Sequence, residues 1–147
     1  MSASKEHDLI VALVARSIRQ HGFDLVALES SLDWLFGKDF KLPPAIVLHR
    51  PDILGVRKAP PYLCIGEAKT CSDLRSKRTR RQLLDFSQTR IGETEEFCQF
   101  IIGIPQDCEM TLNRLLAELS IPTSRIAVLK VPQALLAVTD RAILCQA

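Results

Sequence analysis

The sequence has no run of about 18 apolar residues, the length that a membrane-spanning helix needs, so we expect no membrane span. Its first residues, MSASKEHD, are polar and acidic and lack the pattern of a signal peptide. We therefore expect a cytoplasmic protein with no membrane partner.

Motifs of several protein classes are also missing. No GxGxxG, P-loop or GxSxG sequence occurs, so nothing supports a nucleotide-cofactor enzyme or a serine hydrolase. There is no CxxC pair and no Cys/His cluster with zinc spacing. The five cysteines are Cys64, Cys71, Cys98, Cys108 and Cys145. An odd number of scattered cysteines in a cytoplasmic chain predicts reduced, mostly buried thiols.

What the sequence does contain is enough apolar residues for one domain with its own core. Of 147 residues, 47% are hydrophobic and 24% charged, which is ordinary for a globular protein. No internal repeat, low-complexity tract or domain linker interrupts the chain. We expect a single domain that spans residues 1–147.

Hydrophobic periodicity predicts an alternation of helices and strands. The expected helices are residues 5–20, 74–91 and 111–119, and the expected strands are 23–29, 45–49, 52–56, 62–69, 95–104 and 125–131. Strands 45–49 and 52–56 either continue or pair with each other. Residues 30–44 are predicted as a loop or a short helical turn around 32–36, and residues 132–144 as a last helix or strand. The order α-β-β-β-α-β-α-β predicts an α/β fold with a central mixed β-sheet flanked by helices.

Net charge is only +2, but one segment is strongly basic. Residues 75–81, RSKRTRR, hold five of the nineteen Lys and Arg residues. The five are Arg75, Lys77, Arg78, Arg80 and Arg81. A local basic patch on a nearly neutral domain suits contact with a polyanion such as DNA. A solvated helix face accounts for the cluster equally well.

Charged residues end the clearest predicted strand. In residues 62–69, YLCIGEAK, alternation places Leu63, Ile65, Glu67 and Lys69 on one face, with Glu67 and Lys69 about 7 Å apart along the strand. The apolar half of this face belongs in a core. We expect the charged half to emerge where the sheet opens to water, and the small residues on the opposite face to let a helix approach closely.

Asp52 lies in the preceding strand, directly after Pro51. Proline has no amide hydrogen and favours a bend or a strand edge, and a bend here would turn Asp52 toward Glu67. Two converging carboxylates stay ionised only beside a counter-charge, which a divalent cation supplies. Lys69 beside such an ion would hold a water or stabilise charge on a phosphate, so the set suits phosphodiester hydrolysis. A surface salt bridge is the alternative interpretation.

The Pro-Asp pair at 51–52 and the Glu-Ala-Lys triplet at 67–69 resemble the motif of the PD-(D/E)xK nuclease superfamily. The resemblance extends from the first helix to Ile104, and it is closest to archaeal-type Holliday junction resolvases and the restriction-endonuclease core. It implies a restriction-endonuclease-like α/β core with a site for Mg²⁺, or for Mn²⁺ in its place.

The resemblance also implies roles for individual residues. Asp52 and Glu67 match the metal-binding acids, and Lys69 matches the catalytic lysine. Glu6, in the first helix, matches an additional acid that many members carry. Glu29, at the end of the first strand, is a second candidate for that acid, and a favourable interaction with the helix dipole is an alternative role for Glu6.

The sequence departs from the family patterns at one residue and in one segment. Gln82 and Phe86 resemble a Gln-xxx-Tyr motif with Phe in place of Tyr, and Gln88 competes with Gln82 for the site-facing position. The segment 30–44 is longer than the short Ser-bearing link of the resolvases, with only Ser30 and Ser31 nearby. This puts junction specificity in doubt and leaves the metal site intact.

Two functions are therefore predicted. The first is a metal-dependent DNA endonuclease that works as a homodimer through residues 131–145, with branched or junction DNA and ordinary duplex DNA both open as its substrate. The second is a catalytically inactive module with the nuclease fold, used for nucleic-acid binding or protein assembly.

Overall fold

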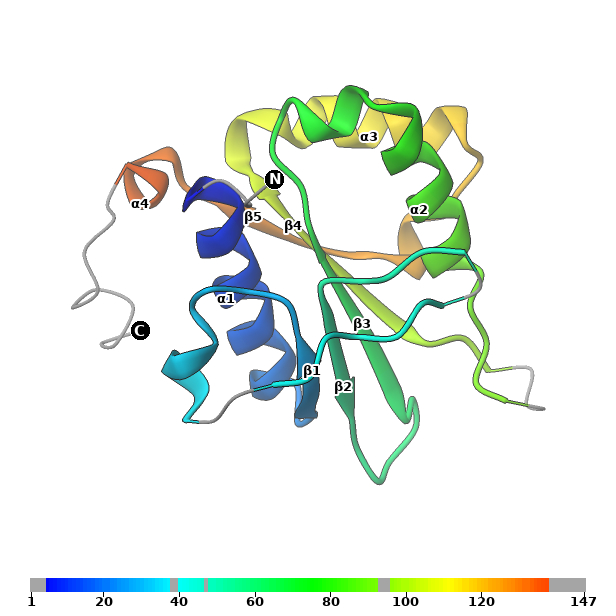
Figure 1. The fold of residues 1–147 in the computed structure, drawn as a ribbon. Helices are drawn as coiled ribbons and strands as arrows, with labels where there is room; N and C mark the ends of the chain where they lie inside the picture. The colour runs from blue at the N-terminus through cyan, green and yellow to red at the C-terminus, as the bar shows by residue number, and fades with distance from the viewer. Residues whose placement is uncertain (1–4, 38–39, 47, 93–95, 138–147) are drawn as a thin grey trace.

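A computed structural model of the chain describes residues 5–37, 40–46, 48–92 and 96–137. The helices are α1 (Lys5–Gln20), α2 (Lys77–Ser87), α3 (Glu109–Glu118) and α4 (Gln133–Leu136), and the strands are β1 (Asp24–Leu28), β2 (Ile53–Val56), β3 (Leu63–Ala68), β4 (Gln99–Pro105) and β5 (Ala127–Val131). The structure has three layers, with α1 and the short α4 on one face of a five-stranded sheet and α2 and α3 on the other (Figure 1). The predicted mixed α/β architecture is confirmed.

The sheet has the strand order β1-β2-β3-β4-β5. The β1–β2 and β2–β3 pairs are antiparallel, whereas the β3–β4 and β4–β5 pairs are parallel. The parallel pairs follow from the helices α2 and α3, which carry the chain back across the sheet between successive strands. A mixed sheet, as predicted, is the result.

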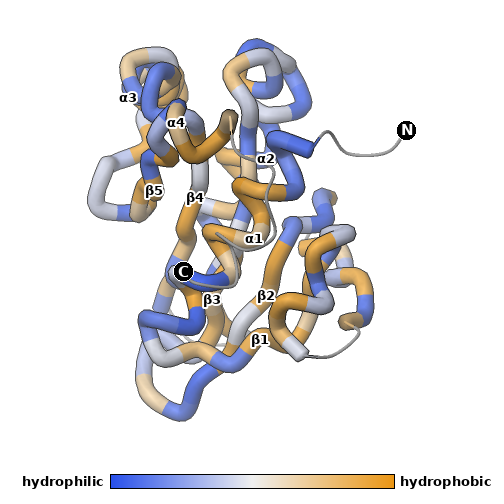
Figure 2. Tube along the Cα trace, turned by 90° about the vertical axis from the view of Figure 1, so that its left-hand side faces the viewer, coloured by the Kyte–Doolittle hydropathy of each residue, from blue (hydrophilic) through white to orange (hydrophobic). Residues whose placement is uncertain are grey.

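Helix α1 packs closely against the face formed by β1 to β4, where glycines make room for it. A Cβ atom on Gly66 would lie 2.7 Å from the side chain of Ile18, and one on Gly103 would clash with Val14. The small residues on this face of β3 therefore let a helix approach, as the alternation predicts. Figure 2 shows hydrophobic residues along α1 and β2, and hydrophilic ones in the loop between β2 and β3.

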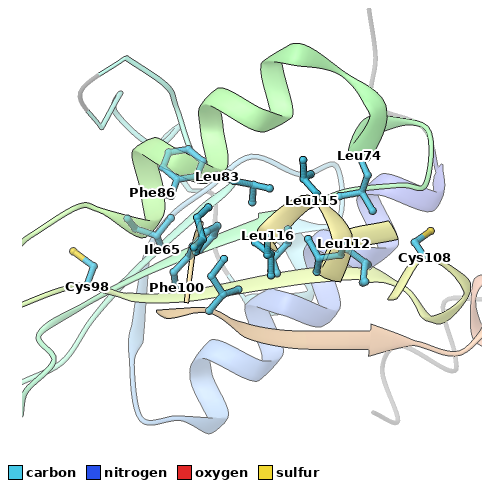
Figure 3. Packing of buried hydrophobic residues seen from close by; sticks show 14 of the residues in the cluster. Ile65, Leu74, Leu83, Phe86, Cys98, Phe100, Cys108, Leu112, Leu115 and Leu116 are labelled. Atoms are coloured by element: carbon cyan, nitrogen blue, oxygen red, sulfur yellow. The ribbon is translucent and has the colours of Figure 1, made fainter. Parts of the chain in front are cut away.

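The opposite face carries the larger core, which α2 and α3 cover. Phe86 of α2 packs edge-on against Phe100 of β4, with 5.7 Å between ring centroids. Leucines from α3 and Ile65 of β3 complete the layer (Figure 3). Cys98 and Cys108 mark opposite ends of this cluster in the same view, so the core runs the length of β4.

The predicted strand at 45–49 is wrong. Only an isolated bridge joins Ile46 to His49 there, and residue 47 lies outside the described part. The Asp85 carboxylate accepts hydrogen bonds from the backbone amides of Leu48 and His49, and it lies 3.1 Å from the His49 ring nitrogen Nδ1. These hydrogen bonds fix the segment against α2. They also occupy backbone amides that would otherwise bond to a neighbouring strand.

Two other boundaries differ from the predictions. The predicted helix 74–91 is shorter, since Ser76 has an extended backbone and its hydroxyl accepts a hydrogen bond from the Thr79 amide at 3.1 Å. This N-cap starts α2 at Lys77. The predicted helical turn near 32–36 is present as a 3₁₀ turn, Asp33–Phe36.

The prediction of reduced thiols is wrong for one pair. Cys71 and Cys108 form a disulfide with 5.6 Å between their Cα atoms. Cys64 and Cys98 are free and buried, and burial raises the pKa of Cys64 to about 12 and that of Cys98 to about 11. Cys145 lies outside the described residues.

The C-terminal segment is described only as far as residue 137. Of the tail predicted as a helix or strand, α4 is helical, and residues 138–147 lie outside the described part, as does most of the predicted dimer surface. In the described ranges, no helix is both long and apolar enough to cross a membrane.

Candidate active site

The antiparallel pairing of β2 and β3 ends at Ile53 and Gly66, and the two strands fork there. Just beyond the fork, the amide of Asp52 donates a hydrogen bond to Glu67 Oε1 at 3.2 Å. The Asp52 carboxylate in turn accepts one from the amide of Ala68 at 2.8 Å. This side chain takes the place of a backbone partner, so Asp52 and Glu67 meet at the fork after Pro51, as the sequence predicts.

Lys69 extends the same cluster by one residue beyond β3. Its ammonium nitrogen lies 3.7 Å from Glu67 Oε2 and donates a hydrogen bond to the side-chain oxygen of Gln82 in α2. Gln88, the competing glutamine, is exposed and lines a cleft at the other end of α2. Of the two glutamines, the structure brings Gln82 to the cluster.

The charged end of the strand is more deeply buried than expected. Glu67 is 2% exposed and Lys69 8%, so the expectation that they emerge into water is wrong. The first turn of α1 reaches this end of the sheet through His7, which contacts Asp52, and α2 reaches it through Gln82, which contacts Lys69. A buried pair of opposite charges is stable only when its remaining polar atoms are hydrogen-bonded, which Gln82 does for Lys69.

His7 is a member of the cluster that the sequence analysis did not identify. Its Nε2 atom lies 3.5 Å from Asp52 Oδ2. A signal was present, because His7 precedes Ile10 by three residues and Val14 by seven, which puts it on the buried stripe of α1. A histidine that continues an apolar stripe at helical spacing points toward the core.

The two candidates for the additional acid lie differently. Glu6 and Glu29 are both exposed, and neither carboxylate makes a hydrogen bond or ion pair with the cluster in the described ranges. The backbone amide of Glu29 donates to the Asp52 carbonyl at 2.9 Å, so Glu29 supports the fork through its main chain. The group that α1 contributes next to Asp52 is His7.

The two acids have opposite shifts in pKa. Burial raises the pKa of Glu67 well above its ordinary value, and the nearby Asp52 carboxylate adds to the rise. Burial also acts to raise the pKa of Asp52, but hydrogen bonds from Glu67 and His7 lower it below its ordinary value. The contact with Asp52 raises the pKa of His7. The pair therefore favours one shared proton over two negative charges.

A divalent cation would be held by two carboxylates here. No group of three or more His, Cys, Asp and Glu side chains suited to a metal ion occurs in the described residues. Mg²⁺ needs only one or two carboxylates, since water and phosphate oxygens complete its coordination. Glu67 Oε2 is buried and has no hydrogen-bond partner among the described residues. Asp52 and Glu67 thus fit a hard cation that replaces their shared proton.

The basic residues of the run 75–81 lie beside this cluster, at the start of α2. Arg80 pairs with Glu118 of α3 at 2.9 Å, and both side chains are largely exposed. The other four, Arg75, Lys77, Arg78 and Arg81, are exposed. The N-terminus of a helix carries a partial positive charge, so each cation placed there destabilises the helix by about 0.3–1 kcal/mol. The basic run therefore adds its positive potential to that of the helix N-terminus. An anion binds favourably to such a surface.

Comparisons with known proteins add no relative. The chain matches no protein-family model, no curated protein and no solved structure. The resemblance to PD-(D/E)xK nucleases therefore stays a prediction that rests on residues 51–52 and 67–69 and on the strands that carry them.

Proposed function

We propose that the protein is a metal-dependent endonuclease that hydrolyses phosphodiester bonds in DNA. One observation carries this proposal: Asp52, Glu67 and Lys69 come from two strands and meet in a single buried cluster at the β2–β3 fork. A salt bridge serving only stability would not need two carboxylates in contact, because their repulsion raises the pKa of Glu67 and weakens the pairing.

Each residue of the cluster has a role in this proposal. Asp52 and Glu67 would hold Mg²⁺ or Mn²⁺, which supplies charge neutralisation and an acidified water when bound. Lys69 stabilises negative charge on the phosphate or orients the attacking water. Gln82 positions the Lys69 ammonium through its side-chain oxygen. His7 keeps Asp52 oriented and ionised.

Two further features support the choice of DNA and of fold family. The chain order α-β-β-β-α-β-α-β and the mixed sheet agree with a restriction-endonuclease-like core. The basic run at the start of α2 lies where neighbouring phosphates would pass, and phosphate contacts of this kind position a nucleic acid without reading its sequence. A homodimer, which brings two sites to two strands, and a cytoplasmic location belong to the same proposal.

Cleavage by the purified protein tests the proposal. The substrates are duplex, single-stranded and branched DNA, each with Mg²⁺, with Mn²⁺ and with a chelator. Wild type should cut only with metal, and Asp52→Asn and Lys69→Ala should abolish cutting. Lys130→Ala is the matched control, because Lys130 of the edge strand β5 forms an exposed ion pair with Glu109 and contacts none of the three cluster residues. Cleavage that survives either site variant would refute the assignment.

A catalytically inactive module is the second candidate, and the burial of the cluster favours it. Glu67 and Lys69 are almost closed to solvent, as expected for charges that stabilise a fold. Calorimetry separates the two functions. Heat of Mg²⁺ or Mn²⁺ binding that disappears in Glu67→Ala supports the enzyme, and DNA binding with neither metal binding nor cleavage supports the module.

A further inference from the structure

A concave site lies at the opposite end of α2 from the basic run. It is a cleft of about 470 Å³ between the C-terminal end of α2, the segment that leads into β4 and the connection from α3 to β5. These segments meet at the right of Figure 1. The residues that matter here are Ser87, Gln88, Arg90, Phe97, Ser120 and Arg125.

Two arginines line this cleft, and neither has an acidic partner among the residues that the structure describes. The guanidinium carbon of Arg125 lies 3.1 Å from the ring centroid of Phe97, and that of Arg90 lies 4.7 Å from it. Neither side chain makes an ion pair or donates a hydrogen bond to any described residue. Stacking on the ring orients the planar groups but leaves their N–H donors available.

Holding two cations together costs free energy that an anion between them would recover. Guanidinium groups bind phosphate through paired N–H donors, and they do so better than an ammonium group because the fork is planar and rigid. Gln88 and Ser120 also line the cleft, and their side chains carry further hydrogen-bond donors. Its chemistry is therefore that of a phosphate site.

Ser120 lines the cleft and has an unfavourable backbone conformation. Its φ is 56°, in the left-handed region, where it ends α3 with its amide bonded to the Ala117 carbonyl at 3.1 Å. Glycine is the residue that most often fills this helix-ending position, because it has no Cβ atom to strain. A serine here keeps a hydroxyl at the mouth of the cleft.

The distance to the candidate active site suits a second contact on the same nucleic acid. Glu67 pairs with Ile102 in the sheet, and Phe97 precedes Ile102 by five positions on the segment leading into β4. At about 3.3 Å per residue, the cleft lies roughly 17 Å from Glu67 along the strand. That is about five nucleotides at a rise of about 3.4 Å each.

We propose that this cleft binds a phosphate group and that, resting on the function proposed above, the group is a backbone phosphate about five nucleotides from the reacting bond. The cleft then anchors the nucleic acid at one end of α2 while the basic run contacts it at the other. Such an anchor fixes which phosphate reaches the fork.

Binding measured without divalent metal tests the cleft separately from cleavage. A labelled DNA duplex is titrated with protein over a range of salt concentrations. Each lost phosphate contact should lower the magnitude of the slope of log K against log salt by about 0.9. Arg125→Gln and the double variant R90Q/R125Q should lower the slope and weaken binding, the double variant by about tenfold or more at low salt. Arg114→Gln removes one exposed arginine from α3 and should change neither.

Gln88→Glu gives a second test that does not disturb the Phe97 stack, because Gln88 is exposed. Its carboxylate should repel phosphate and weaken DNA binding, with an unchanged thermal unfolding midpoint. The other arm titrates inorganic phosphate and follows the side-chain Nε–H signals of Arg90 and Arg125 by NMR. These signals should shift in the wild type and stay unchanged in Gln88→Glu.

The outcomes separate the possible sources of phosphate. Arginine-dependent DNA binding supports the backbone phosphate, and it stands even if the protein cuts no DNA. Phosphate shifts with DNA binding unaffected by R90Q/R125Q would support the cleft but assign it to a small phosphate-bearing molecule. Wild-type DNA binding in R90Q/R125Q, together with no phosphate shifts, would overturn the proposal and leave the cleavage assignment untouched.

Discussion

The charged groups at the two ends of α2 differ in their burial and in their pairing. Beside its first half, Lys69 and Glu67 are buried and form an ion pair, and the half-buried Asp52 is hydrogen-bonded to Glu67 through its backbone amide. Beside its last turn, Arg90 is exposed and Arg125 is half-buried, and both lie against the ring of Phe97 without an ion pair to any described residue. Buried, coupled charges shift their pKa values and suit chemistry, whereas open, unpaired cations keep their charge and suit binding.

The largest expected effect separates chemistry from binding. Lys69→Met should lower kcat by about a thousandfold with little change in DNA affinity, since it removes charge that stabilises the transition state. R90Q/R125Q should raise KM with kcat nearly unchanged. Steady-state kinetics on one duplex with Mn²⁺ measures both. An equal loss of kcat in the two variants would mean that the two ends do not differ in function.

The second effect is on stability, because among the described residues a disulfide crosslinks one end of α2 and not the other. The Cys71–Cys108 disulfide joins the loop after Lys69 to the start of α3, and it closes a loop with a sequence separation of 37. Cys71→Ser/Cys108→Ser should lower the unfolding free energy by about 3–4 kcal/mol, mainly by freeing the unfolded chain.

Urea unfolding of this double variant, with and without a dithiol reductant, provides the measurement. Reductant should destabilise the wild type by a similar amount and leave the double variant unchanged. Cys98→Ser, at the cleft end, should cost about 1–3 kcal/mol by burying a hydroxyl, and reductant should not alter that difference. A reductant that leaves wild-type stability unchanged would contradict the crosslink.

The third effect is the pH dependence of stability in the metal-free protein. The folded pKa of Glu67 is raised, so this group supports the fold fully below its ordinary pKa near 4.5, and that support is lost as pH rises through the folded value. The pKa of Asp52 is lowered, so its support is present above its ordinary value near 3.8 and is lost as pH falls.

Glu67→Gln should therefore remove the decline in unfolding free energy that begins above pH about 4.5, keep the decline on the acid side, and leave a smaller decline above pH about 6.5 that comes from the raised pKa of His7. Urea unfolding across this range measures both limbs. R90Q/R125Q is the control, since arginines do not titrate in this window. If Glu67→Gln retained the full alkaline decline, Glu67 would not be its source.

Much of the site was predictable because it depends on local geometry. Alternation along β3 is enough to put Glu67 and Lys69 on the face of Ile65, and Pro51 is enough to end the pairing next to Asp52. The order of elements followed from periodicity in the same way. These features need only the period of the backbone and the chemistry of single residues.

What the sequence did not predict depends on contacts between distant segments. The Cys71–Cys108 pairing requires the loop after β3 to meet the start of α3, which spacing alone does not specify. The failed strand at 45–49 reflects Asp85, almost forty residues away on α2. The burial of Lys69 likewise depends on Gln82. His7 differs, because its place on the apolar stripe of α1 was visible in the sequence.

The smallest expected effect concerns Ser120 of the cleft, where one substitution should raise the stability of the protein and weaken phosphate binding. Ser120→Gly relieves a left-handed backbone conformation that costs a residue with a Cβ atom about 1–2 kcal/mol, and part of that gain is lost to the greater freedom of glycine in the unfolded chain. We expect a net gain of about 0.5 kcal/mol in unfolding free energy, with weaker phosphate binding because the hydroxyl is gone.

Ser124→Gly, a substitution at an exposed position without positive φ, is the control and should instead lower the stability. Urea unfolding and the phosphate titration, run on both variants, measure the two quantities. A Ser120→Gly protein that is more stable and binds phosphate as well as the wild type would show that the serine hydroxyl takes no part in binding.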